Sequence, residues 1–128
     1  MVSAQVRLRR MSKVNLAEKL ALVNEHWSPK TVGGMNDYEV KVVKVQGEFT
    51  WHTHAETDEF FLVIEGRLTI RLRDGEVILE PGELYVVPKG AEHCPYSDGE
   101  TQVLLIEPKG VVNTGDAGGE LTAAAQRL

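Results

Sequence analysis

The sequence predicts an all-β domain of the sandwich or barrel kind, with one short helix before it. Three observations lead to this prediction. About six to eight short segments with the apolar patterns of strands follow residue 38. Turn signals recur between them about every 8–12 residues, and no alternating strand–helix–strand pattern follows residue 30.

Composition fits a globular protein and excludes several other classes. The chain is 42% hydrophobic and 26% charged, as ordinary domains are. Its formal net charge of −5 argues against nucleic acid or an anionic membrane as the main partner, because both attract a basic surface. One cysteine cannot form an internal disulfide, and no apolar run approaches the ~20 residues that span a bilayer. Since the basic opening residues lack the apolar region of a secretory signal, we expect a cytoplasmic protein.

The 128 residues are expected to form one domain with two flanking segments. Residues 1–30 are the N-terminal segment that carries the helix, and residues 31–110 are the β domain. Residues 111–128 form a C-terminal tail of small and polar residues, which we expect to be draped over the surface or frayed.

The helix is expected within residues 12–27. Three apolar side chains recur there at helical spacing: Leu16, Leu20 and Val23. Asn15 is a suitable N-cap, because its side chain can accept a hydrogen bond from an N–H of the first turn. Ser28-Pro29 is expected to end the helix, because proline has no backbone N–H to donate.

The predicted strands show two patterns. Residues 60–64 are apolar at every position, which is typical of a strand buried on both faces. Residues 68–72 alternate leucine and isoleucine with threonine and arginine, so one face is expected to lie in solvent. Further strands are expected within residues 38–47, 77–79, 84–87 and 103–106.

Glycine and proline mark the turns between these strands. Asp74-Gly75 is typical of a tight hairpin. Pro81-Gly82 and Pro88–Gly90 bracket the strand between them, and the glycines supply the positive φ that such turns often require.

Strands that are apolar on both faces also predict a dimer. Residues 60–64 and 103–106 need cover on their outer side as well as in the core. A short chain has few residues left to supply it, so we expect a homodimer in which the N-terminal segment provides part of the cover.

Three of the four histidines are spaced as metal ligands are. His52 and His54 lie two residues apart in a strand-like stretch, so their side chains project from the same face. Glu59 begins the buried strand that follows, and His93 lies just past the Pro88–Gly90 turn. Imidazoles with one carboxylate suit a divalent first-row transition metal, although a His-x-His pair alone is more often two solvated side chains.

These residues belong to two motifs that resemble those of the cupin family. The first reads Gly47-EFTW-His52-Thr53-His54-AETD-Glu59-FFLVIE-Gly66. The second reads Gly82-ELYVV-Pro88-Lys89-Gly90-AE-His93-CPY-Ser97. The chain departs from the family pattern in the spacer before His52, which is one residue shorter, and at Ser97, where the family has asparagine. Neither departure falls on a ligand position.

The resemblance implies the fold, the metal site and the usual assembly. Residues 31–110 are expected to form a cupin-type barrel, a double-stranded β-helix or jelly roll, usually in a dimer. The implied ligands of one divalent transition metal ion per chain are His52, His54, Glu59 and His93. Manganese, iron, nickel, copper and zinc all accept such ligands, so the sequence does not identify the metal.

The resemblance further implies a small-molecule ligand. We expect a metal-dependent enzyme that acts on a small organic substrate, a dioxygenase-like oxidoreductase. Fold alone does not select the reaction. A sugar-phosphate isomerase-like enzyme and a metal- or ligand-binding module without turnover are the alternatives, whereas a metal-free epimerase fits a complete ligand set less well.

The expected pocket favours an apolar ligand over a sugar phosphate. Lys89 lies in a turn, and three arginines are expected to face solvent: Arg67, Arg71 and Arg73. The expected apolar walls come from Phe61, Val63 and the strand of Leu68 and Ile70. Such walls favour a small, partly aromatic ligand that chelates the metal through oxygen, because a phosphate would be desolvated there without a partner.

Three further residues are assigned structural roles. His26 is placed in the helix and matches no motif position. Cys94 follows His93 directly, so it is expected to face the opposite side of the strand as a core thiol. Trp51 is expected to pack on the outer side of the strand that carries His52.

Overall fold

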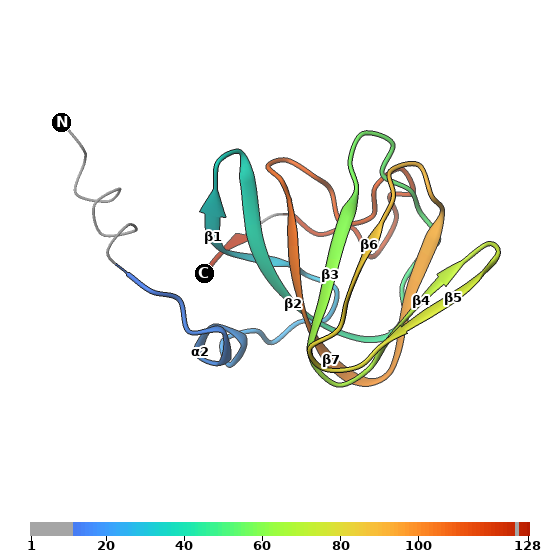
Figure 1. Ribbon diagram of the computed structural model, residues 1–128. Helices are drawn as coiled ribbons and strands as arrows, with labels where there is room; N and C mark the ends of the chain where they lie inside the picture. The colour runs from blue at the N-terminus through green and yellow to red at the C-terminus, as the bar shows by residue number, and fades with distance from the viewer. Residues whose placement is uncertain (1–11, 125) are drawn as a thin grey trace.

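The computed structural model describes residues 12–124 and 126–128 and is built almost entirely of strands, as predicted (Figure 1). One helix, α2 (Leu16–Leu20), comes first. The strands are β1 (Lys30–Met35), β2 (Tyr38–Glu48), β3 (Glu59–Glu65), β4 (Leu68–Leu72), β5 (Gly75–Leu79), β6 (Leu84–Val87), β7 (His93–Pro108) and β8 (Gln126–Arg127). All strands expected from the alternation of apolar residues are present.

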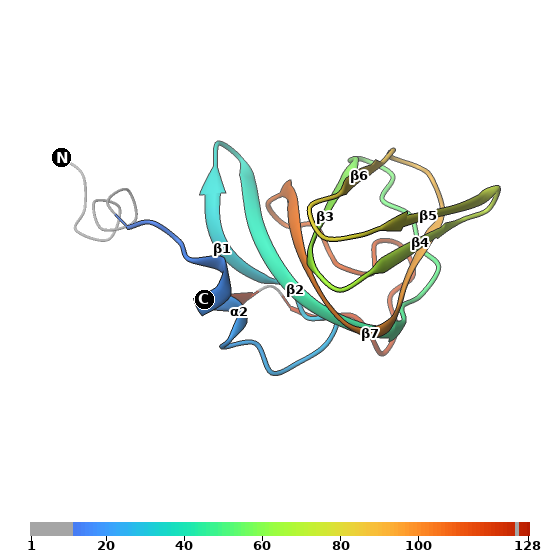
Figure 2. The ribbon, with the colours of Figure 1, turned by 60° about the horizontal axis from the view of Figure 1, so that its bottom comes forward.

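The strands form one curled sheet (Figure 2). Its main order is β5-β4-β7-β2-β1-β8, and β3 pairs with both β7 and β6. The long strand β7 connects the halves, because its first residues pair with β4 and its last residues with β2 and β3. Among the strands that the structure describes, β5 pairs only with β4 and β6 only with β3, so hydrogen bonds do not close the sheet completely.

Apolar side chains from the inner faces fill the space inside the curled sheet. The core consists of Val43, Val45, Phe61, Val63, Leu68, Ile70, Leu79, Val87, Val103 and Leu105. Each such side chain contributes about 1.5–3 kcal/mol when fully removed from water. The predicted core strand at residues 60–64 has this arrangement, with Phe61 and Val63 inside and the alternate residues half-buried on the outer face.

The helix is shorter than the sequence predicted. Asn15 is its N-cap, and its side chain accepts a hydrogen bond from the Glu18 N–H at 3.0 Å. The helix ends at Leu20, however, and the prediction that it continues to Ser28-Pro29 is wrong. The Trp27 N–H donates to the Lys44 carbonyl of β2, so pairing with the sheet replaces a continued helix.

Strand β1 was missed by the sequence prediction. It pairs with β2 in antiparallel register across a turn at Asn36, which has φ of 55°. Gly33 and Gly34 lie within it, and their lack of side chains removes the alternation from which the other strands were predicted.

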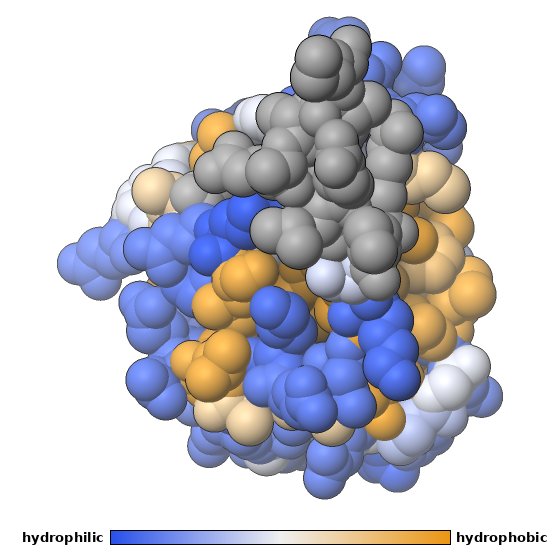
Figure 3. Space-filling view, turned by 90° about the vertical axis from the view of Figure 1, so that its left-hand side faces the viewer, coloured by the Kyte–Doolittle hydropathy of each residue, from blue (hydrophilic) through white to orange (hydrophobic). Residues whose placement is uncertain are grey.

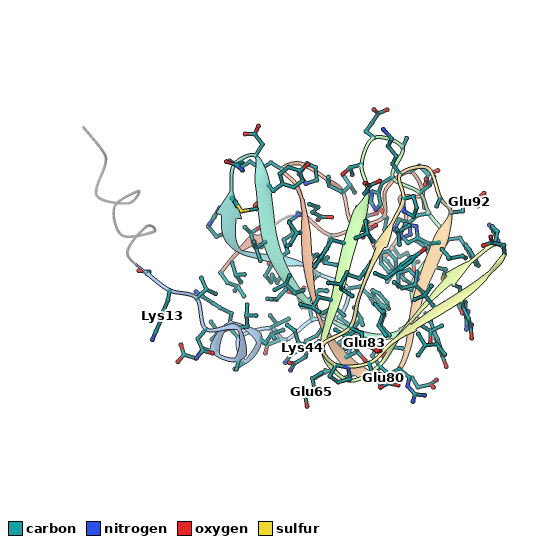
Figure 4. All side chains as sticks on the ribbon, in the orientation of Figure 1. Lys13, Lys44, Glu65, Glu80, Glu83 and Glu92 are labelled. Atoms are coloured by element: carbon teal, nitrogen blue, oxygen red, sulfur yellow. The ribbon has the colours of Figure 1, made fainter. Side chains whose placement is uncertain are left out.

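Charged side chains gather mainly on the outside. Figure 4 shows Lys13, Glu65 and Glu92 at the outer edge of the molecule. The expected exposure of Arg67, Arg71 and Arg73 is confirmed, with side chains 66%, 36% and 60% exposed. Apolar surface is also visible on the face that carries α2 and β1 (Figure 3). Within the described ranges, no helix is both long and apolar enough to span a membrane.

Candidate metal centre

Backbone pairing brings two of the predicted histidines face to face. The N–H of His52 donates to the carbonyl of His93 at 3.0 Å, and the N–H of His93 donates back to His52 at 2.9 Å. Residues paired in this way project their side chains from the same face. The His54 carbonyl accepts the N–H of Gly90 at 2.9 Å, so the turn before β7 also holds the chain next to His54.

The structure brings all four sequence-predicted residues together. His52, His54, Glu59 and His93 are buried, and one potential ligand atom of each lies within 4.8 Å of the others. Glu59 Oε2 lies 2.7 Å from Nε2 of His54, 3.0 Å from Nε2 of His93 and 3.9 Å from Nε2 of His52. Three imidazole nitrogens thus surround one carboxylate oxygen.

The outer nitrogens of two rings are fixed by the backbone. Nδ1 of His52 lies 2.8 Å from the Thr50 carbonyl, and Nδ1 of His93 lies 3.0 Å from the Ala91 carbonyl. A carbonyl only accepts, so each Nδ1 carries a proton, and the neutral form of each ring would offer its Nε2 lone pair to a metal ion. Carbonyls in this position commonly orient histidine ligands of metals.

The pKa values of His52, His54 and Glu59 are shifted from those of free side chains. Burial and the neighbouring His93 lower the pKa of His52 to about 4, so this ring is neutral at pH 7. Burial opposes ionisation of Glu59, but His54 and His93 lower the pKa of that carboxyl to about 2. Burial also disfavours a charged His54, yet the Glu59 carboxylate raises the pKa of His54 above its usual value.

These donors fit a transition-metal ion. Nε2 of His52 is buried and has no hydrogen-bond partner among the described residues, and Nε2 of His54 lies 2.7 Å from Glu59 without the geometry of a hydrogen bond. Leaving a buried polar atom unpaired costs about 1–3 kcal/mol, and a coordinated ion would satisfy these nitrogens. Imidazole nitrogen with carboxylate oxygen suits manganese, iron, nickel, copper or zinc. The cluster could therefore hold one metal ion.

A mainly apolar cavity opens beside the cluster. Its empty space, counted together with the open solvent at its mouth, is about 470 Å³. Its lining residues are Trp27, Pro29, Val43, Val45, Phe49, His52, Glu59, Phe61, Leu68, Pro95, Val103, Leu105, Glu107 and Asn113. Phe61 and Leu68 line it as expected, whereas Val63 and Ile70 are fully buried in the core. A ligand in this cavity would contact His52 and Glu59 of the cluster on one side and apolar side chains on the others.

Residues 112–123, here called the C-terminal strap, pack against the loop that carries His54. The Thr53 N–H donates to Asp116 Oδ1 at 2.9 Å, and the Asp116 N–H donates to the Thr53 carbonyl at 3.2 Å. Asn113 fastens the strap to Trp27, because its Nδ2 donates to the Trp27 carbonyl at 3.1 Å. The tail is thus draped over the end of the sheet where the cluster lies.

The residues with assigned structural roles lie outside the cluster. The prediction that His26 lies in the helix is wrong. His26 forms a β-bridge with Lys44, and its Nε2 lies 2.8 Å from Glu100 Oε2. Cys94 is fully buried, and burial raises the pKa of its thiol. Arg73 stacks 3.8 Å above the Trp51 ring on the outer side.

Sequence reasoning missed a buried ion pair on the inner face. Lys41 Nζ donates to Glu107 Oε1 at 2.8 Å, and both side chains are 4% exposed. Burial raises the pKa of Glu107, although Lys41 opposes this rise. A signal was present, because Lys41 alternates with Val43 and Val45 and therefore shares their inner face.

Comparison with known proteins identifies the family. The family model for the cupin domain, Cupin_2, matches residues 39–108. The uncharacterized protein YdbB of Bacillus subtilis (strain 168) is 35% identical over 101 residues, which are 77% of this chain and 89% of that protein. A cupin-2 domain protein of Shewanella frigidimarina NCIMB 400 has a crystal structure that is 49% identical, with a TM-score of 0.76 over 78% of this chain and 98% of that chain.

A more distant structure shares the fold. Hydroquinone 1,2-dioxygenase PnpCD, in complex with Cd²⁺ and 4-hydroxybenzonitrile, is 19% identical, with a TM-score of 0.68. The match covers 92% of this chain and 79% of that chain. The family model spans more than half of the chain and includes both histidine motifs. This chain therefore belongs to the cupin family.

Proposed function

We propose that the protein is a metal-dependent oxidoreductase of the dioxygenase kind, acting on a small aromatic or partly apolar substrate. The observation that carries the proposal is the position of the buried cluster beside the apolar cavity. His52, His54, Glu59 and His93 would be the ligands of one ion per chain. A hydroquinone 1,2-dioxygenase shares this fold, so the fold can accommodate such a reaction, although it does not select it.

The residues of this chain would bind and orient the substrate. Phe49, Phe61 and Leu105 provide apolar walls, which exclude water and favour an aromatic ring. The bound metal would supply Lewis acidity and, for a redox-active ion, the ability to activate dioxygen. The backbone carbonyls at Nδ1 of His52 and His93 would hold these rings in place throughout.

The first test is ligand binding and turnover with the iron-loaded protein. Catechols and 1,3-diketones are expected to perturb its absorption spectrum, and oxygen uptake with a phenolic substrate is expected to exceed that of the metal-free protein. Sugar phosphates are not expected to compete. Turnover of mannose 6-phosphate instead of phenols would contradict the proposal, and spectral binding without any turnover would favour a binding module.

The sugar-phosphate alternative finds no support in the cavity. The charged side chains among its lining residues are carboxylates, Glu59 and Glu107, which would repel a phosphate. Lys41 does face inward, but its ammonium is already paired with Glu107. A phosphate ester would therefore be desolvated without a free cation.

Metal affinity is expected to fall as the pH decreases. A histidine binds metal through its neutral form, so protons compete below its pKa. The pKa of His54 is raised by Glu59, so this competition should begin above the ordinary value of about 6.5 and should cost about tenfold in affinity per pH unit for one displaced proton. His52, with its pKa of about 4, should add to the loss only in acid. Competition titrations with a chelator between pH 5 and 9 would measure the slope, and a flat profile would argue against His54 as a ligand.

We also propose that two copies pack through the outer face of the sheet. The register places Val86, Phe60 and Ile106 in one row and Leu84, Leu62 and Leu104 in the next. Leu84 and Val86 are 54% and 41% exposed, and such a continuous apolar face is typical of an interface. Separately, we propose that the protein is cytoplasmic, which cell fractionation would test.

Light scattering is expected to give a particle of about twice the chain mass of 14.2 kDa. Leu84→Glu should shift it to a monomer at micromolar concentration, because a charge would be buried in the interface. Ile78→Glu is the matched control, since Ile78 is 49% exposed on β5, away from these rows. A monomeric wild type would contradict this assembly.

A further inference from the structure

Glu107 is a charged side chain of the cavity that the proposed metal ligands do not include. It is 3% exposed and lines the cavity together with His52 and Glu59. The other polar lining residue outside the cluster, Asn113, already uses its amide, because its Nδ2 donates to two carbonyls and its Oδ1 accepts the Ala123 N–H. Glu107 therefore stands out as a polar group that can respond to a ligand.

The register places Glu107 beside the metal centre. Phe60 of β3 pairs with Ile106 of β7, and this is the last pair at that end of the two strands, so Glu59 and Glu107 follow it at the same end of the sheet. Both side chains line the same cavity. A ligand oxygen at the cluster would thus bring the rest of a small molecule next to Glu107.

Lys41 engages one oxygen of this carboxylate. Its Nζ donates to Oε1 of Glu107 at 2.8 Å, while the structure shows no hydrogen bond from a described residue to Oε2. A buried ion pair is weak evidence for stability, because apolar side chains of similar volume often replace one without loss. The pair orients Glu107 and leaves Oε2 without a hydrogen bond from a described residue, so this oxygen is available to accept one.

We propose that Glu107 determines specificity by accepting, through Oε2, a hydrogen bond from a hydroxyl or amino group of the ligand. The inference rests on the proposed function, in which a first oxygen of the same ligand binds at the metal centre. An ionised carboxylate only accepts hydrogen bonds. The site would therefore select diols and aminophenols and reject ligands with a second carboxylate or a phosphate.

The test compares pairs of probes that differ in one donor. Hydroquinone and resorcinol are each compared with their monomethyl ethers, and 4-hydroxybenzoate provides the negative second group. Binding is measured by calorimetry without oxygen, on zinc-loaded protein, so that no probe is oxidised. In the wild type each diol is expected to bind about tenfold more tightly than its ether, as a hydrogen bond to a charged group allows.

Three variants test whether Glu107 causes the preference for diols over ethers. Glu107→Gln should reduce the preference for diols over ethers to less than about threefold, because one charge-assisted hydrogen bond is lost, and the metal content should stay that of the wild type. The double variant Lys41→Met/Glu107→Leu keeps the volume of the pair without its charges and should abolish the preference. Glu39→Gln is the matched control, since Glu39 is the cross-strand partner of Glu107 but its carboxylate accepts from Thr31 and does not line the cavity.

The outcomes separate this inference from the proposed function. The role of Glu107 would be overturned, and the proposed function left standing, by any of three results. These are diol binding no tighter than ether binding, an unchanged preference for diols in Glu107→Gln, and 4-hydroxybenzoate binding as tight as that of hydroquinone. Failure of the zinc-loaded wild type to bind any of these phenols would overturn the proposed function, and this inference with it.

Discussion

Replacement of His93 by alanine is expected to reduce the bound metal from about one ion per chain to a small fraction of that. His93 is 1% exposed, and its Nε2 lies 3.0 Å from Glu59 in the centre of the cluster. Loss of a group that merely orients a ligand costs about 10–100-fold in affinity, so loss of a proposed ligand should cost at least about 100-fold. Elemental analysis of purified protein and chelator competition would measure this change.

The matched control for this experiment is His26→Ala. His26 is also a histidine, but it contacts Glu100 on the exposed side, with 40% of its side chain accessible. Its replacement should leave metal content unchanged. His93→Ala should still fold, although Glu59 loses a buried partner, at a cost of about 1–3 kcal/mol in the free energy of unfolding. A folded His93→Ala protein that binds metal as the wild type does would contradict the ligand assignment.

The strands and the cluster could be predicted because both depend on local spacing. Alternation along a strand fixes which side chains share a face, so His52 and His54 had to project together. Fixed spacing from Glu59 and from the turn before His93 then linked the pair to the two cupin motifs. The structure brings these four residues together as the motifs implied.

The features that were missed depend on contacts between distant segments. The helix ends early because Trp27 pairs with Lys44 of β2, which the periodicity of residues 12–27 cannot reveal. The Lys41–Glu107 pair joins residues 66 positions apart, and each charge alone suggests a solvated side chain. Pairing of this kind appears only when β2 and β7 are placed side by side.

The role of the C-terminal strap was also hidden from local patterns. Its glycines and small polar residues are typical of a surface tail. Thr114 is nevertheless fully buried, and the Asp116 carboxylate is hydrogen-bonded to the backbone of Thr53, next to His54. The strap therefore supports the segment that carries His52 and His54, and its packing should influence the proposed metal site.

Gly115→Ala is expected to weaken both this support and the binding of metal. Gly115 has φ of 54°, and a Cβ there would lie 2.3 Å from the Thr53 carbonyl oxygen and 3.2 Å from Cε1 of His54. Contact with a backbone oxygen at that distance cannot be relieved by a side-chain rotation, so the strap or the loop must move. Gly118→Ala is the matched control, because Gly118 has φ of 62° and no atom within 4 Å of the added Cβ.

Gly115→Ala and Gly118→Ala should both lose stability through the left-handed backbone, but only Gly115→Ala should also displace Thr53. Alanine in the left-handed region costs about 1–2 kcal/mol, which both proteins should show in the free energy of unfolding. Only Gly115→Ala should lose a further amount and bind metal about tenfold or more weakly, because displacement of Thr53 moves the proposed ligand His54. Denaturant unfolding and chelator competition on both variants would measure these differences. Equal metal affinity in the two proteins would show that the strap covers the cluster without positioning it.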